Sequence, residues 1–197
     1  MTECAPLITY VGYKGHKVGS CGIVVDRMEI KVLSDDPENR PGELLTRGAN
    51  MMTGYYKNPE ATAEAIDKDG WLHTGDLVTI DKDGCVFIRG RKKNMLLGAN
   101  GQNVYPEEVE DVVLSNTIAD ECVLVQRDQK FVALVYTNDM TLEKHKLQRE
   151  QLEYVFECSR DEVNALLPKF AQLTAFEIRE EEFQKTPKKN IKRFLYK

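Results

Sequence analysis

Apolar and polar residues alternate in several short segments of the first ninety residues. The alternation is clear in Gly22–Val32 and in Gly42–Arg47, and the turn-forming cluster Ser34–Pro41 separates these segments. A period of two is typical of strands that bury one face. Asn58–Ile66 instead combines an early proline with an alanine-rich run, which indicates a short helix. The pattern therefore predicts a small twisted β-rich subdomain over residues 1–90.

A hairpin is predicted at the end of this β-rich half. Leu77–Ile80 and Cys85–Arg89 are short, mainly apolar runs, and the turn between them ends in Asp-Gly. Asp-Gly between two such runs is a strong signal for a hairpin. If the strands pair directly across the turn, Asp76 lies about opposite Arg89, and Arg91 lies one step further along. The hairpin then brings a carboxylate and a guanidinium to the same end.

These two groups suit a nucleoside. A carboxylate can accept hydrogen bonds from two adjacent ribose hydroxyls, and a guanidinium offers a fork of donors. The alternative is an ion pair that only closes the end of the hairpin. From the residue types alone this simpler interpretation is favoured, because an isolated Asp-Arg pair is a weak signal for a site.

The second half of the chain combines helical repeats of apolar residues with strands, and its elements are longer. The pattern predicts a helix, two strands, a long helical stretch and a third strand, in the order Pro106–Ser115, Cys122–Gln126, Phe131–Tyr136, Thr141–Leu167 and Ala175–Ile178. A break in the long helical stretch is expected near Ser159–Asp161, and Pro168 ends it. The prediction is an α+β class, in which the β-rich subdomain is followed by a compact domain over residues 95–197 with helices packed on a small sheet. The charged link 91–94 is the expected hinge between the two.

Length, charge and cysteine content narrow the class of protein. The chain has 197 residues and a formal net charge of −5, which allows two small domains and argues against bulk nucleic-acid binding. Its five cysteines are odd in number and lack the spacing of a metal site, so a reduced, cytoplasmic protein without structural zinc is expected. No apolar run approaches the ~20 residues of a membrane helix, and the first residues do not resemble a signal peptide.

Five segments resemble the signature motifs of one enzyme family. They are TGD at Thr74–Asp76, GRKKN at Gly90–Asn94, GQNVYPEEVE at Gly101–Glu110, the long block Gly42–Thr62, and the closing segment Lys185–Arg193. Their order and spacing are similar to those of the acyl-adenylate-forming enzymes, which include acyl-CoA synthetases, peptide-synthetase adenylation domains and luciferases. The resemblance covers nearly the whole chain. Within the family, the residues of the motifs look most like those of the long-chain fatty acyl-CoA synthetases.

The resemblance implies a two-step reaction with ATP, magnesium and coenzyme A. In the first step a carboxylate attacks the α-phosphate of ATP and gives an acyl-adenylate and pyrophosphate. In the second step the thiol of coenzyme A displaces AMP. Family members use one site and rotate the small C-terminal domain between the steps, because each step needs different groups beside the same carbonyl carbon.

The resemblance also assigns roles to single residues. Asp76 would hold the ribose hydroxyls of ATP and AMP, and Arg91 would add a ribose or phosphate contact. Lys93 falls at the hinge position, although a solvated lysine in a charged loop is the alternative. Gly101 would let the backbone approach the pantetheine tunnel closely, which a Cβ would block.

The first residues, Met1–Glu3, look like the end of an earlier motif of the family. By this match Thr2 would contact the phosphates and Glu3 the magnesium ion. The start inside a motif indicates a fragment of a longer enzyme. Because no phosphate loop with a following lysine occurs in the chain, and most of the acyl pocket is expected upstream, the fragment alone is expected to be inactive.

The closing motif departs from the family pattern at Asn190. Family members usually have a lysine there, whose charge neutralises the charge that develops on the α-phosphate and the carboxylate. Either Lys189 substitutes from a shifted backbone, or adenylation by the parent protein is weak. For the lysine-rich tail Lys185–Lys197 a solvated, mobile C-terminus is the simplest alternative. A basic tail that contacts an anionic membrane or RNA, with Phe194 and Tyr196 stacking, is a smaller one.

The sequence therefore predicts part of an AMP-forming fatty acid–CoA ligase that uses fatty acid, ATP and coenzyme A. It acts in the cytoplasm, with peripheral membrane contact left open. An acyl–acyl carrier protein synthetase, or a ligase for a shorter or aromatic acid, is the alternative among enzymes. A non-catalytic nucleotide- or partner-binding module is the alternative from another class, and Asn190 favours it. Acyl chain length and oligomeric state stay open.

Overall fold

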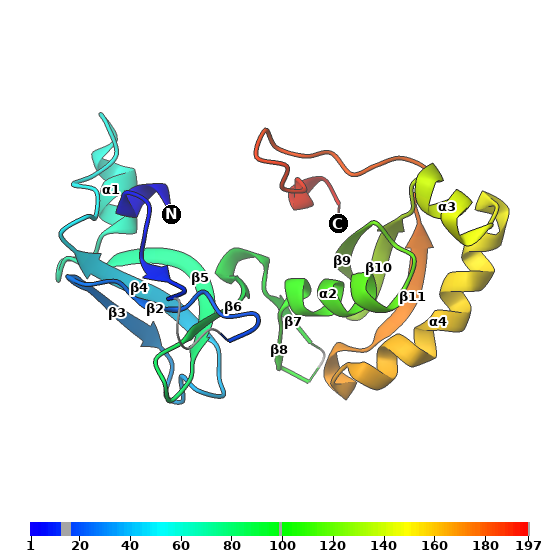
Figure 1. Ribbon diagram of the computed structural model, residues 1–197, viewed down its shortest axis with the longest axis horizontal. Helices are drawn as coiled ribbons and strands as arrows, with labels where there is room; N and C mark the ends of the chain where they lie inside the picture. Colours follow the sequence, from blue (N-terminus) through cyan, green and yellow to red (C-terminus); the bar gives the residue numbers. More distant parts are fainter. Residues whose placement is uncertain (13–16, 99, 197) are drawn as a thin grey trace. The chain divides into compact units, whose positions relative to one another are not determined.

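The chain forms two compact units, Met1–Lys93 and Asn94–Lys197. The computed structural model describes residues 1–12, 17–98 and 100–196 (Figure 1). Each unit has its own sheet and its own hydrophobic core. Strands and helices are mixed along the chain without a regular βαβ alternation, so the predicted α+β class is confirmed.

The first unit is built on a four-stranded antiparallel sheet. In spatial order its strands are β3 (Met28–Leu33), β4 (Gly42–Gly48), β5 (Leu72–Ile80) and β6 (Val86–Arg91). Three smaller elements accompany the sheet: the 3-10 helix η1 (Thr2–Cys4) and the paired strands β1 (Thr9–Tyr10) and β2 (Ile23–Val24). The sheet places a short apolar cluster, Leu44, Val78 and Val86, at its centre.

The predicted short helix is confirmed as α1 (Pro59–Ala65). Pro59 occupies the first turn, where its missing N–H has no partner to lose, and the Asn58 side chain caps the helix by accepting from the Ala61 N–H at 3.0 Å. The alternating segment Gly22–Val32 forms two strands. It is divided into β2 and β3 by a turn in which Arg27 has a positive φ of 63°.

The predicted hairpin is present, but its register differs from the direct pairing. Asp76 lies opposite Arg91, whereas the prediction placed it opposite Arg89. The turn is longer than assumed, because Ile80 pairs with Val86, and the ladder shifts once more beyond Val78. This bulge inserts an extra residue in one strand, which a count from the turn alone cannot anticipate.

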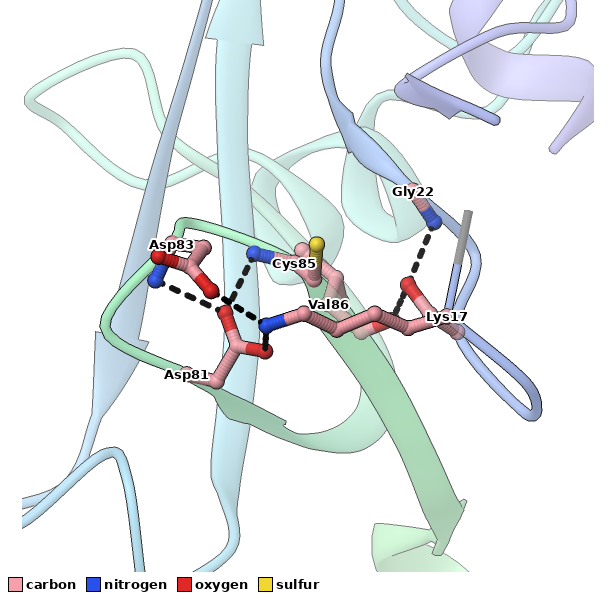
Figure 2. Close-up of polar contacts among 7 residues, drawn as sticks. Lys17, Gly22, Asp81, Asp83, Cys85 and Val86 are labelled. Atoms are coloured by element: carbon pink, nitrogen blue, oxygen red, sulfur yellow. Dashed lines mark hydrogen bonds and ion pairs between the residues drawn. The ribbon is translucent and has the colours of Figure 1, made fainter. Parts of the chain in front are cut away.

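The hairpin turn is held by an ion-pair cluster (Figure 2). Lys17 Nζ lies 2.5 Å from carboxylate oxygens of both Asp81 and Asp83. Asp81 Oδ1 also accepts from the backbone N–H groups of Asp83 and Cys85, at 2.9 and 3.0 Å. The bond to Lys17 lowers the pKa of Asp81 despite a partial desolvation that acts in the opposite direction. The cluster therefore fixes the end of the hairpin that lies away from Asp76.

The second unit is built on a three-stranded sheet in the order β11–β10–β9. Its strands are β9 (Glu121–Arg127), β10 (Lys130–Tyr136) and β11 (Leu173–Ile178). Strands β9 and β10 form an antiparallel hairpin, while β10 and β11 run parallel. A parallel pair needs a long crossover, and here the crossover contains α3 (Asp139–His145) and α4 (Leu152–Leu166). The two predicted strands of the hairpin and the third strand are confirmed.

Helices α2 and α4 cover one face of this sheet (Figure 1). α2 (Pro106–Asn116) agrees with the predicted helix, and its Val109 and Val113 join Phe156 and Val163 of α4 in the core. The remaining elements of the unit are short: η2 (Lys92–Asn94), which bridges the two units in sequence, β7 (Leu96–Leu97), β8 (Asn103–Val104), η3 (Arg149–Gln151), η4 (Lys169–Ala171) and η5 (Arg193–Leu195).

The break in the long helical stretch lies earlier than predicted. It follows α3, where Lys146 adopts a left-handed conformation with φ 55° and its N–H donates to the end of the helix. α4 passes through Ser159–Asp161 without interruption. There the Ser159 hydroxyl donates to the Val155 carbonyl at 2.9 Å, and Arg160 pairs with Glu157 one turn earlier. The polar residues are thus satisfied on the helix itself and do not end it.

The C-terminal tail packs on the opposite face of the sheet (red in Figure 1). Phe183 is buried and meets Tyr196 edge to face, with ring centroids 4.8 Å apart. Ile191 and Tyr196 pack against Val123 and other outward residues of β9 and β10. Neighbouring residues of a strand point to opposite faces, which explains why Val123 faces the tail and Leu124 faces the helices. The tail is therefore docked on the sheet through Ile191 and Tyr196, while Lys188–Asn190 and Phe194 are exposed to solvent.

An ion pair between Arg193 and the buried carboxylate of Glu110 joins the tail to α2. Arg193 binds Glu110 with two parallel contacts, Nη1 to Oε1 at 2.5 Å and Nη2 to Oε2. Glu110 is only 5% exposed, and its Oε1 also accepts from the Leu124 N–H at 2.6 Å. Burial raises the pKa of Glu110, and the bonds to Arg193 oppose that rise. One carboxylate therefore connects helix, sheet and tail.

Replacing Arg193 with methionine should destabilise the second unit by about 3–5 kcal/mol at neutral pH, because Glu110 is left buried without its partner. A carboxyl whose pKa is raised on folding favours the folded state only when it is protonated. The loss should therefore shrink as pH falls and Glu110 takes up a proton. Urea unfolding of Arg193→Met and wild type at pH 7 and pH 5 measures this.

Arg127→Met is the matched control, because Arg127 pairs with Glu177 in the same unit and both side chains are about half exposed. That exposed pair should contribute at most ~1 kcal/mol. An equal loss in the two variants, or a loss for Arg193→Met that grows toward acid pH, would contradict the assignment.

Candidate functional site

The TGD motif lies in the first half of β5, where Asp76 is paired with Arg91 at the end of β6. Asp76 and Arg91 are partners in the strand register, and Arg91 Nε lies 2.9 Å from Asp76 Oδ1. Arg91 Nη1 also donates to the Thr74 carbonyl at 3.1 Å. Gly75, which lies between Thr74 and Asp76 in the sequence, has a φ of +70°. Glycine adopts this conformation without strain. The two side chains that the sequence singled out are thus in direct contact.

Thr74 positions this pair, and its role was not expected from the sequence. Its buried hydroxyl donates to the Leu44 carbonyl at 2.8 Å and accepts from the Asp76 N–H at 3.1 Å. A threonine in a strand is ordinarily a packing residue. Only its place in the TGD motif could have indicated that Thr74 also positions Asp76. The hydroxyl fixes the backbone from which the Asp76 carboxylate projects.

Asp76 has a mixed electrostatic environment. Burial raises the pKa of its carboxyl, while the Arg91 guanidinium acts to lower it. A partly desolvated carboxylate that one guanidinium orients makes stronger hydrogen bonds than one in open water.

Thr2 and Glu3 lie in η1 at the start of the chain. The Glu3 carbonyl accepts from the Met52 N–H at 2.7 Å, and Glu3 Oε1 accepts from the Tyr55 hydroxyl at 3.2 Å. The first residues of the chain are therefore packed against the motif Gly42–Thr62, which contains Met52 and Tyr55. Within the described ranges no cluster of three or more histidine, cysteine or carboxylate side chains is arranged to hold a metal ion. Glu3 offers one carboxylate, which fits a magnesium ion held mainly by phosphates and water.

Gly101 belongs to the glycine loop between β7 and β8. Its φ is +77°, and a Cβ at this position would meet no heavy atom within 4 Å. Its conformation, and not crowding within the described chain, explains why glycine suits the position. Gly98 is tighter, since a Cβ would lie 3.2 Å from Asn100 Oδ1. Beside the loop is an open hollow of about 500 Å³, which Leu97 and Gln126 also line.

The closing motif forms a tight turn. The Lys189 N–H donates to the Thr186 carbonyl and the Thr186 N–H donates to the Asn190 carbonyl, both at 2.8 Å. Lys189 has a φ of 62°, the left-handed conformation that glycine usually adopts. Lys189 and Asn190 are exposed at this turn, while Lys185 and Ile191 pair as its base.

The candidate residues divide between the two units. Thr2, Glu3, Asp76 and Arg91 belong to the first unit, Gly101, Lys189 and Asn190 belong to the second, and Lys93 is the last residue of the first. None of the helices in the described ranges has both the length and the apolar surface needed to cross a bilayer.

Two family descriptions match the chain. Residues 1–56 match "AMP-binding enzyme", and residues 93–196 match "AMP-binding enzyme C-terminal domain". Among solved structures, the o-succinylbenzoate CoA synthetase of Bacillus subtilis with its acyl-adenylate intermediate is similar with a TM-score of 0.80 and 23% identity, over 100% of this chain and 40% of that chain. An ATP-bound RpMatB-BxBclM chimera also has a TM-score of 0.80, at 25% identity over 99% of this chain and 38% of that one.

Curated relatives extend the comparison. A long-chain-fatty-acid–CoA ligase of Escherichia coli O6:H1 is 44% identical over 130 residues, which are 64% of this chain and 23% of the relative. 4-Coumarate–CoA ligase 5 of Oryza sativa subsp. japonica is 43% identical over 118 residues, or 57% of this chain and 22% of the relative. The chain thus spans about a quarter of the length of these relatives. The family match to residues 93–196 covers more than half of the sequence, and the chain belongs to the AMP-binding enzyme family.

Proposed function

We propose that this chain is the C-terminal portion of an ATP-dependent, AMP-forming ligase that joins a long-chain fatty acid to coenzyme A. The observation that carries the proposal is the Asp76–Arg91 pair, formed by two family motifs at one end of a hairpin. A carboxylate oxygen of the acid attacks the α-phosphorus of ATP, and the bond to pyrophosphate breaks. The sulfur of coenzyme A then attacks the acyl carbon, the bond to AMP breaks, and the thiol proton leaves.

The nature of the acid rests on similarity. The relative named as a long-chain-fatty-acid–CoA ligase is 44% identical to this chain, which supports a fatty acid. A 4-coumarate–CoA ligase is 43% identical over a similar region, so an aromatic acid is the second candidate. Assays of the parent enzyme with palmitate and with 4-coumarate distinguish the two.

In this proposal the first unit binds the nucleotide. Asp76 accepts hydrogen bonds from the ribose hydroxyls, and Arg91 orients its carboxylate and adds a ribose or phosphate contact. Thr2 contacts the phosphates, and Glu3 is the carboxylate that would hold magnesium, whose charge favours attack on the phosphate. Cytoplasmic ATP is the source of the nucleotide.

The second unit supplies groups that change between the two steps. Gly101 gives the backbone of its loop the shape needed beside the pantetheine of coenzyme A. Lys189 offers the cation for adenylation, because it is exposed next to Asn190, where the family usually has lysine. Lys93 is the hinge. Its side chain is exposed and forms no ion pair or hydrogen bond with another described residue, which supports a role in motion and not in binding.

Asp76→Ala in the enzyme that contains this chain should weaken ATP and AMP equally, because both nucleotides carry the ribose. The loss of a hydrogen bond to a charged group corresponds to roughly 1.5–3 kcal/mol. Calorimetric titration with each nucleotide measures the effect. Asp83→Ala at the other end of the same hairpin is the control and should leave both affinities unchanged. Wild-type affinity in Asp76→Ala would remove the nucleotide role from this residue.

Asn190→Lys should leave pyrophosphate exchange nearly unchanged if Lys189 already neutralises the charge of adenylation. Lys189→Ala should then slow exchange by ~10²–10³-fold, because one preorganised electrostatic group is lost. Thioester formation from supplied acyl-adenylate should be unaffected by either change, since the rotated domain carries this turn away from the carbonyl. A large gain in exchange for Asn190→Lys, with no loss for Lys189→Ala, would show instead that the parent enzyme lacks this cation. Undetectable exchange in the wild-type parent would favour the non-catalytic nucleotide-binding module.

A further inference from the structure

Two consecutive residues at the end of the first unit are tied to its sheet. Arg91 binds Asp76 and the Thr74 carbonyl, as described above. The next residue, Lys92, places its Nζ 2.8 Å from Glu43 Oε2. Both attachments lead back to neighbouring strands, Asp76 on β5 and Glu43 on β4. The link can therefore move freely only after Lys92.

Glu43 is a fixed anchor. It is 6% exposed, and the same Oε2 lies 3.4 Å from His73 Nδ1 on the adjacent strand β5. Burial alone would raise the pKa of Glu43, but Lys92 and His73 outweigh it and the pKa is lowered. A buried carboxylate that stays ionised requires a cation nearby. Lys92 is the mobile partner of the two, because its side chain is 60% exposed and belongs to the link.

A second attachment holds the link to the other unit. Asn94 Nδ2 donates to Glu107 Oε1 at 2.6 Å, and Glu107 lies in the first turn of α2. Asn94 is thus bound to the unit that it begins. Lys93 lies between the two attachments, and its side chain has no partner among the residues that the structure describes.

We propose that Glu43 and Glu107 are positioning residues that restrict the hinge to Lys93. With both attachments formed, rotation about the backbone of Lys93 alone changes the arrangement of the units without breaking either attachment. Loss of the Glu43–Lys92 bond would extend the free link to two residues, and loss of the Asn94–Glu107 bond as well would extend it to three. The proposal rests on the proposed function only in so far as the ligase uses domain rotation.

The test measures the distance between the units in this chain without substrate. Exposed Cys158 on α4 carries one spin label, and Lys31→Cys on β3 carries the other, with Cys21→Ser to remove a competing thiol. Electron–electron double resonance gives the width of the distance distribution. The reach of a flexible link grows as the square root of the number of free residues. Lys92→Ala should therefore widen the distribution by ~1.4-fold, and Lys92→Ala with Asn94→Ala by ~1.7-fold.

Lys92→Ala is the main variant because the mostly exposed side chain can be removed without disturbing the core. Glu43→Gln should give the same widening, and Lys92→Arg should restore the wild-type width by replacing the cation. Glu29→Gln is the matched control: Glu29 pairs with Arg47 on the same sheet at 2.8 Å, but away from the link. Lys92→Ala leaves the buried Glu43 carboxylate with His73 alone and should lower the thermal unfolding temperature, whereas Glu43→Gln removes the buried charge together with the bond and should unfold near wild type. Widening in Glu43→Gln at wild-type stability therefore separates positioning from stability.

Equal widths in wild type, Lys92→Ala and Glu43→Gln would overturn the proposal. Widening in Glu29→Gln as well would also overturn it, because any lost charge on the sheet would then loosen the link. The distance measurement needs no catalysis. A widened distribution in a protein whose parent forms no acyl-adenylate would therefore leave the hinge restriction intact and reject the ligase function.

Discussion

The arrangement of the second unit depends on the buried contact between Glu110 and Arg193. The two residues are 83 positions apart and join the helix that follows the glycine loop to the last segment of the chain. A buried charge is costly unless it is paired, so the tail cannot dock partly: either Arg193 reaches Glu110 or Glu110 remains unpaired in the core. The docked tail in turn fixes the base of the turn that presents Lys189 and Asn190. A residue far from the candidate chemistry thus determines where that chemistry is presented.

The division of the candidate residues between two units fits a reaction in two steps. The ribose is common to ATP, the acyl-adenylate and AMP, so groups that bind it can stay fixed in the first unit. The groups beside the carbonyl must differ between adenylation and thioester formation, and a rotating unit can present first one set and then another. In the proposed ligase, Asp76 and Arg91 serve the constant part of the substrate, while the loop of Gly101 and the turn of Lys189 serve the changing part.

Much of the local structure could be predicted from the sequence, because it follows from local signals. The period of two in the strands, the proline at the start of α2 and the Asp-Gly turn all act within a few residues. The features that were missed depend on partners far away in the chain. The bulge that places Asp76 opposite Arg91 arises in the pairing of two strands, and the docking of the tail depends on Glu110. The break at Lys146 was missed for a different reason: it uses a left-handed lysine, where the sequence has neither glycine nor proline.

The packing of the tail also narrows which cation can replace the lysine that the family has at position 190. Lys185 is unsuitable, because its ammonium group already binds both Glu121 and Glu182 and its pKa is raised by them. Lys189 is exposed and adjacent to Asn190, so its Cα lies about 3.8 Å from that of the family position. A flexible four-carbon side chain can cover such a displacement, and a left-handed backbone at Lys189 directs it differently from an extended one. In the proposed ligase the turn would therefore move the charge by one residue without removing it, and this proposal favours an active enzyme over a module that has lost catalysis.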